Sequence, residues 1–151
     1  MALWFKKAQQ GPAEVTIDRI ADHFDEVEYN YDRQESGALS AIFDDVLLFV
    51  GIEDNWFRVT GVRWDIPLPV ERGEEMIGWL NSYMAETRFG TGTIELDENN
   101  GRYDLSFAVV FTVAEGLYDD QLRDFLAAGM GCVIDGVKQF CERFEIPTME
   151  D

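Results

Sequence analysis

The sequence predicts a single α+β domain in which an antiparallel sheet packs with helices in the order α, β-meander, α, β-hairpin, α. Two observations support this prediction. The hydrophobic period alternates between helical and strand-like along the chain, and no repeat, low-complexity segment or linker divides its 151 residues. We expect the domain to cover residues 14–146, with a mobile leader over residues 1–13 and a short tail over residues 147–151.

The leader does not have the pattern of a secretory signal. Its apolar residues precede Lys6 and Lys7, whereas a signal places its charge first and then needs roughly 7–15 apolar residues. We therefore expect a cytoplasmic protein with a mobile N-terminal segment. The alternative is that Leu3, Trp4 and Phe5 dock on an apolar groove of the same or another subunit.

The first helix is predicted from Thr16 to about Val27. Its apolar residues recur at spacings of three and four, which places them on one stripe. Thr16 suits the N-cap position and Asp18 suits the positive end of the helix dipole. Arg19 stands where a Glu or Gln would complete a capping box.

A meander of three or four strands follows. Tyr29 and Tyr31 alternate with polar neighbours, and apolar runs then cover residues 38–43, 46–52 and 57–64. Short turns between successive strands favour antiparallel pairing. Whether residues 38–52 form one strand or two stays open at this point.

The second half of the chain predicts a helix, a hairpin and a long last helix. Pro67 and Pro69 suit the start of a helix over about residues 70–86. Asn100-Gly101, between strands 93–96 and 102–113, predicts a type I′ turn, which needs positive φ at both central residues. The last helix is expected over about residues 119–144.

Two strands of this sheet have apolar residues on both faces. Residues 46–50 and 107–111 show no polar alternation, whereas a sheet open to water on one side normally alternates. Either helices cover both faces, or a partner subunit covers the face that the helices leave free.

The middle helix also suggests a partner contact. Its apolar residues spread over an arc of about 160°, wider than the roughly 100° that packing on one sheet requires. Aromatic and Met side chains are enriched at interfaces. We expect Met76, Trp79 and Tyr83 to contact a partner, with ordinary core packing as the alternative.

The sequence argues against several kinds of chemistry. Its 30 acidic and 12 basic residues give a net charge of −18, which disfavours a nucleic-acid groove or a polybasic membrane patch. A single histidine, His23, and two cysteines cannot supply a structural zinc site, and no cofactor motif is present. Cys132 and Cys141 fall on opposite sides of the last helix, so we expect reduced thiols.

Five short segments resemble one bacterial family. They are Thr16-Ile17-Asp18-Arg19-Ile20, residues 57–64, Leu68-Pro69-Val70-Glu71, Leu80-Asn81-Ser82-Tyr83 and Asp119-Asp120-Gln121-Leu122. Over roughly residues 14–146 the chain resembles the YbjN-like proteins, which are labelled sensory transduction regulators. Tyr83 replaces the Trp that is common in that family.

The resemblance implies the fold of the type III secretion chaperones. Those chaperones are small, acidic, cytoplasmic homodimers that bind extended segments of partner proteins. The resemblance supplies no catalytic residues.

We therefore expect a non-enzymatic cytoplasmic module that binds an unidentified protein partner, is a homodimer, and attracts basic partners through its charge. One alternative is a small-molecule sensor, with Gly129 and Gly131 making room for a ligand between the sheet and the last helix. A carboxylate-dependent enzyme is a weaker alternative, because 30 acidic residues make any chosen pair uninformative.

Overall fold

The computed structural model describes residues 11–149 and contains a six-stranded antiparallel sheet in the order β1-β2-β3-β4-β6-β5. The strands are β1 (Asp32–Arg33), β2 (Leu39–Phe43), β3 (Val46–Glu53), β4 (Trp56–Ile66), β5 (Thr91–Asp97) and β6 (Arg102–Thr112). The helices are α2 (Ile17–Glu26), the short 3-10 helix η1 (Val70–Arg72), α3 (Gly73–Thr87) and α4 (Asp119–Arg143). The predicted α+β order is confirmed.

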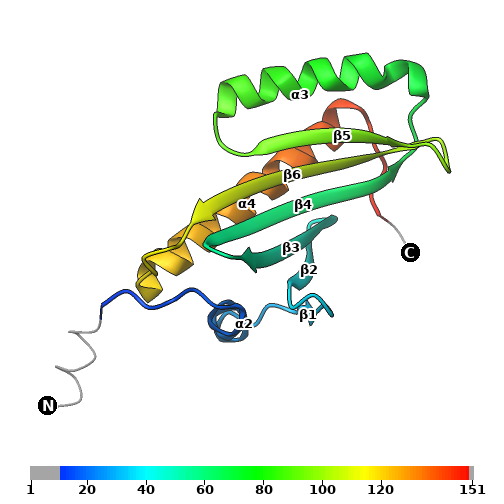
Figure 1. Cartoon of the computed structure of the whole chain (residues 1–151). Helices are drawn as coiled ribbons and strands as arrows, with labels where there is room; N and C mark the ends of the chain where they lie inside the picture. Colours follow the sequence, from blue (N-terminus) through cyan, green and yellow to red (C-terminus); the bar gives the residue numbers. More distant parts are fainter. Residues whose placement is uncertain (1–10, 150–151) are drawn as a thin grey trace, which may run out of the picture.

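The long helices cover one face of this sheet and leave the other face free (Figure 1). Helix α4 packs across β3, β4 and β6, and α3 packs along β5. Helix α2 lies below the sheet, beside the start of α4. The prediction that helices cover both faces is therefore wrong, because none of the described helices crosses the front face in Figure 1.

Helix α4 approaches the sheet closely at glycines. A Cβ atom on Gly136 would lie 2.8 Å from the ring of Phe107, and one on Gly129 would lie 3.0 Å from Val59. Gly131 faces open space, with no atom within 4 Å of such a Cβ. Gly129 therefore marks tight packing, and this pair does not make room for a ligand between the sheet and α4.

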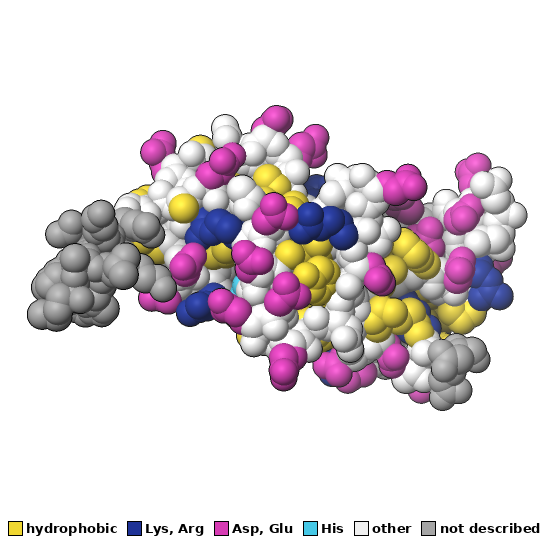
Figure 2. All heavy atoms as spheres, turned by 90° about the horizontal axis from the view of Figure 1, so that it is seen from below, with side chains coloured by type: hydrophobic (Ala, Val, Ile, Leu, Met, Phe, Trp, Pro, Cys, Tyr) yellow, Lys and Arg dark blue, Asp and Glu magenta, His cyan; other side chains and the backbone are white. Residues whose placement is uncertain are grey.

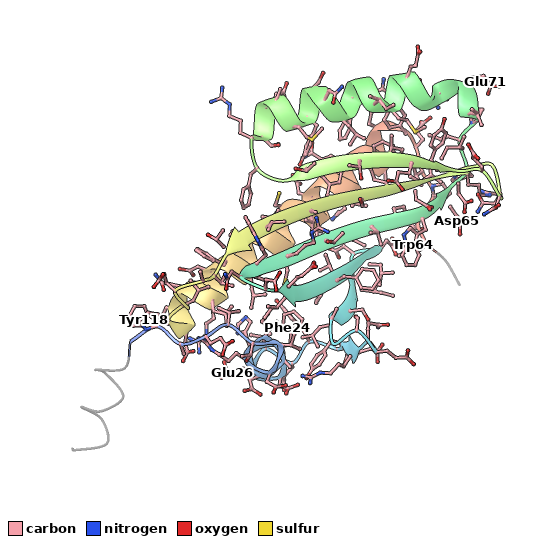
Figure 3. All side chains as sticks on the ribbon, viewed as in Figure 1. Phe24, Glu26, Trp64, Asp65, Glu71 and Tyr118 are labelled. Atoms are coloured by element: carbon pink, nitrogen blue, oxygen red, sulfur yellow. The ribbon has the colours of Figure 1, made fainter. Side chains whose placement is uncertain are left out.

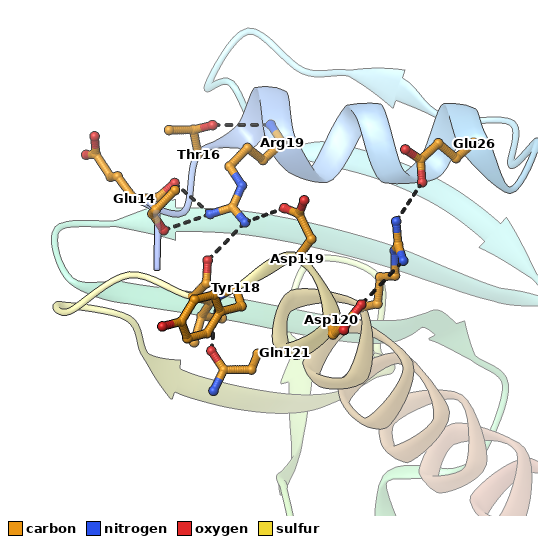
Figure 4. A network of polar contacts seen from close by, with 11 residues as sticks. Glu14, Thr16, Arg19, Glu26, Tyr118, Asp119, Asp120 and Gln121 are labelled. Carbon is orange, nitrogen blue, oxygen red and sulfur yellow. Dashed lines mark hydrogen bonds and ion pairs between the residues drawn. The ribbon is translucent and has the colours of Figure 1, made fainter. Parts of the chain in front are cut away.

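The arginine at the capping-box position joins three segments (Figure 4). The Arg19 guanidinium donates hydrogen bonds to the carbonyls of Ala13, Glu14 and Leu117 at 2.7–3.0 Å, and to Asp119 Oδ1 at 2.8 Å. The Arg19 amide donates to Thr16 Oγ1 at 3.2 Å, which confirms the predicted N-cap. Arg19 thus fixes the chain before α2 to the start of α4.

The two hairpin turns settle one open question and correct one prediction. Residues 38–52 form two strands, and the two-residue turn with positive φ at both positions is Asp44-Asp45, with φ of 49° and 66°. The hairpin of β5 and β6 closes at the pair of Asp97 and Arg102 with a four-residue loop, in which only Gly101 has positive φ. The predicted type I′ turn at Asn100-Gly101 is therefore wrong.

The meander has four strands, but the first of them, β1, begins only after Tyr29 and Tyr31. Both rings pack edge-on against Phe24 of α2, with centroids 5.5 and 5.7 Å apart, and β1 has only two residues. The tyrosines alternate because they cover one core side chain and not because they lie in a sheet.

The ends of the described chain bond to the domain. The amide of Ala13 donates to the Leu117 carbonyl at 3.1 Å, and the Arg63 guanidinium donates to the Pro147 carbonyl. These residues belong to the predicted leader and tail, so bonding extends at least one residue beyond each predicted boundary. Leu3, Trp4 and Phe5 lie outside the described residues. Within residues 11–149, no helix has the length and apolar character needed to cross a membrane.

Candidate functional site

The face of the sheet that faces away from α4 carries the candidate site, and we name it the open sheet face. Because successive strand residues point to opposite sides, the buried residues of β3, β4 and β6 alternate with residues on this face. Register brings Phe49 opposite Thr60, Thr60 opposite Ala108, and Arg58 opposite Val110. The open sheet face is thus continuous across three strands.

Two hollows lie on this face and share the three residues Arg58, Thr60 and Val110. The first has a volume of about 840 Å³ and is mainly apolar, with Phe49, Trp56 and Gly51 among its lining residues. The second has a volume of about 560 Å³ and reaches towards β5 and the end of α3. We name the two hollows together the groove.

The groove and its surroundings expose large apolar side chains. Trp56 is 50% exposed, Trp64 is 51% exposed and Val110 is 41% exposed. The rings of Trp64 and Phe49 lie 6.2 Å apart between centroids, so Trp64 extends the aromatic surface beyond the hollows. Figure 3 shows Trp64 at the opposite end of the sheet from Tyr118. Contiguous exposed apolar surface of this kind marks an interaction site.

The second hollow is more polar than the first and is positively charged. Arg58 and Arg88 both line it, together with the hydroxyl side chains of Thr60, Thr91, Thr93 and Ser106. Among the described residues, neither arginine lies within ion-pair distance of an Asp or Glu. The chain as a whole is strongly acidic, and Figure 2 shows many acidic side chains on the face seen from below, with a few Lys and Arg side chains among them.

The three residues expected to contact a partner lie on α3, away from the groove. Met76 is 0% exposed and Tyr83 is 9% exposed, so both belong to the core. Trp79 is half-buried and stacks on Tyr83, with ring centroids 5.0 Å apart. The partner contact at Met76, Trp79 and Tyr83 stays a prediction, and of the three only Trp79 offers surface to a docking molecule.

Tyr83 also has a polar role inside the domain. Its hydroxyl donates to Asp135 Oδ2 on α4 at 3.0 Å, which joins the two helices. Burial, followed by this hydrogen bond, raises the pKa of Tyr83 above the usual range for tyrosine. The wide apolar arc of α3 thus reflects contact with both β5 and α4.

The residues considered for other chemistry are separate from the groove. His23 lies on α2, and its Nδ1 atom is buried without a hydrogen-bond partner among the described residues. Cys132 and Cys141 are free thiols, and burial raises the pKa of both. Within residues 11–149, no group of three His, Cys, Asp or Glu residues is arranged to hold a metal ion.

One signal in the sequence pointed to the open sheet face, namely the apolar runs at 46–50 and 107–111. It did not single out Trp56, Trp64, Arg58 or Arg88. An apolar pattern on both faces of a strand does not show which face the helices cover, and the arginines are distant in sequence. Their convergence depends on the pairing of β4 with β6 and of β6 with β5.

Comparisons with known proteins place this geometry in context. Residues 16–145 match a family model, YbjN, described as "Putative bacterial sensory transduction regulator". No curated protein sequence matches the chain. The fold is similar to the crystal structure of YbjN from E. coli, described as "a putative transcription regulator". The TM-score is 0.75 at 12% sequence identity, over 90% of this chain and 97% of that chain. At this identity the structural match shows the fold, whereas the family match covers most of the sequence. The chain therefore belongs to the YbjN family.

Proposed function

We propose that the chain is a non-enzymatic regulatory module that binds an extended segment of a partner protein in the groove. The observation that carries this proposal is an aromatic, water-exposed sheet face on a domain whose two longest helices, α3 and α4, pack elsewhere. The family description and the description of the E. coli structure both name regulators, which is consistent with a binding role. A cytoplasmic location and a homodimeric state are part of this proposal.

The dimensions of the groove suit a chain segment. It crosses from β3 to β5, which means four neighbouring strands. Strands lie about 4.8 Å apart, so this path is roughly 15 Å long, or about four to five extended residues. A segment of that length can place apolar side chains in the first hollow and polar ones in the second.

The exposed tryptophan of the groove supplies part of the binding energy. A tryptophan carries about 200 Å² of surface, so covering the exposed half of Trp56 removes about 100 Å² from water. At about 25 cal/mol per Å² this contributes about 2.5 kcal/mol, which is less than the cost of association. Further contacts along the groove must therefore supply the net affinity.

Gly51 offers a way to block the groove without disturbing the fold. It lies on β3 and lines the first hollow, and a Cβ there would meet only Ala38 Cβ, at 3.7 Å, an ordinary contact distance. Gly51→Leu should therefore fill the hollow and leave the domain folded. Gly78→Ala is the matched control, because Gly78 lies on α3 and a Cβ there meets nothing within 4 Å.

The test is quantitative co-purification from cells that express the wild-type chain, Gly51→Leu or Gly78→Ala as bait. We expect the same partner with the wild type and with Gly78→Ala, and a loss of at least about tenfold with Gly51→Leu. Equal recovery with all three baits, at equal melting temperatures, would contradict the proposal.

A small-molecule sensor is the second candidate, because the volume of the first hollow lies within the usual range of about 300–1,000 Å³ for ligand pockets. It predicts a metabolite that raises the melting temperature of the wild type and of Gly78→Ala in a saturable way, but not that of Gly51→Leu.

A further inference from the structure

We infer that the segment bound in the groove is acidic, and that Arg58 and Arg88 hold its carboxylates. This inference rests on the proposed function and names the chemistry of the partner. It is the opposite of what the net charge of −18 suggests, since that charge by itself attracts basic partners.

The first support is the pairing of the other arginines. Of these seven, five form ion pairs within the domain, namely Arg19, Arg33, Arg72, Arg123 and Arg143. Arg63 instead donates to the Pro147 carbonyl, and Arg102, like Arg58 and Arg88, has no carboxylate partner among the described residues. What distinguishes Arg58 and Arg88 is that both line the same hollow, which Arg102 does not.

The second support is how the two arginines are placed. Arg58 projects from β4 onto the open sheet face, opposite Val110. Arg88 is the C-cap of α3, with a left-handed φ of 56°. The chain turns at Arg88 from the end of α3 towards β5, and the Arg88 side chain lines the second hollow. Strand β4 and the end of α3 thus supply one positive charge each.

The third support is the set of groups around them. Thr60, Thr91, Thr93 and Ser106 add hydroxyl groups to the second hollow, and the hydroxyls of Thr93 and Ser106 lie 2.8 Å apart. Hydroxyls and guanidinium groups donate hydrogen bonds to carboxylates, and a guanidinium can bind one in a bidentate way.

The local charge of the groove disfavours a basic segment. Glu53 is the only carboxylate among the residues that line the two hollows, and it lies in the first one. The groove therefore carries two positive side chains and one negative, on a domain that is otherwise strongly acidic. A segment with Lys or Arg in the second hollow would face two guanidinium groups without compensation.

The inference is tested with fluorescein-labelled peptides in which Phe and Leu alternate with Glu, compared with versions that carry Gln or Lys in place of Glu. In anisotropy titrations of the wild-type chain, we expect the Glu peptide to bind about tenfold tighter than the Gln peptide, and the Lys peptide to bind weakest.

The double variant Arg58→Gln/Arg88→Gln should lose the preference for Glu and keep the affinity for the Gln peptide. Arg102→Gln is the control, because Arg102 is an exposed arginine that lines neither hollow. This control should keep the full preference.

The outcomes separate the two proposals. If the peptides bind without regard to charge and Gly51→Leu abolishes that binding, the acidic-segment inference fails and the proposed function stands. If no peptide binds and Gly51→Leu retains the cellular partner, both fail. If light scattering shows a wild-type dimer that Gly51→Leu makes monomeric, a second copy occupies the groove and the inference is overturned.

Discussion

Trp79 on α3 and Trp56 on the open sheet face are both partly exposed, but they should differ in how much they stabilise the fold. Trp79 stacks on Tyr83 at 5.0 Å and meets Phe140 and Phe144 edge-on at 5.7 and 6.3 Å. Aromatic pairs contribute about 0.5–1.5 kcal/mol each beyond the area they bury. With that area included, we expect Trp79→Ala to lower the free energy of unfolding by about 3 kcal/mol.

Trp56 provides the contrasting case. It is half exposed on β4 and has no aromatic contact among the described residues. We expect Trp56→Ala to change the free energy of unfolding by less than about 1 kcal/mol, while it weakens partner binding.

Both free energies are measured by urea unfolding, followed by far-ultraviolet circular dichroism so that loss of a tryptophan does not affect the signal. A loss below about 1 kcal/mol for Trp79→Ala, or above about 2 kcal/mol for Trp56→Ala, would refute this assignment of core and surface.

Three further predictions follow from the packing and the polar contacts. Arg19→Lys should lower the free energy of unfolding by about 1.5–3 kcal/mol, since one ammonium group cannot reach all four acceptors of the guanidinium; an unchanged urea midpoint would contradict this. Both Gly131→Ala and Gly136→Ala gain helix propensity, but only the latter meets Phe107, so Gly136→Ala should be less stable than Gly131→Ala by about 1–3 kcal/mol in the same assay. The raised pKa of Tyr83 means that its contribution to stability is complete below about pH 9 and is lost as the pH rises above about 10, where the unfolded chain ionises first. The stability difference between the wild type and Tyr83→Phe should therefore shrink between about pH 9 and 11, and a constant difference would refute the buried environment of this hydroxyl.

The periodic elements could be predicted from the sequence because their hydrophobic spacing reflects burial directly. Helices α2, α3 and α4 and the strands β2 to β6 lie close to their expected ranges. The N-cap at Thr16 was predictable because its hydrogen bond to the Arg19 amide is local. The role of the Arg19 side chain was not predictable, because its acceptors at Leu117 and Asp119 are about a hundred residues away in sequence.

The turns show where local rules are insufficient. Asn100-Gly101 has the residues that a type I′ turn prefers, but the pairing of Asp97 with Arg102 makes the loop four residues long. Asp44-Asp45 forms the two-residue turn although aspartate at both positions is a weaker signal. Strand register, which depends on which residues of the whole sheet must be buried, decides both cases.

The candidate site was the least predictable part of the molecule. The sequence indicated that one sheet face needed cover, but Met76 and Tyr83, which carry the apolar arc of α3, are used inside the domain. The groove instead combines side chains from β3, β4, β5, β6 and the end of α3, and only the fold brings them together.

We expect the partner to contact the open sheet face. Site-specific photo-crosslinking tests it most directly, with a benzophenone amino acid in place of Trp56 on the open sheet face or of Ile77 on the exposed side of α3. Both side chains are about half exposed, so the probes are matched in accessibility. We expect a crosslinked partner from position 56 and none from position 77. Crosslinking from position 77 alone would contradict this expectation and would direct attention back to the surface of α3.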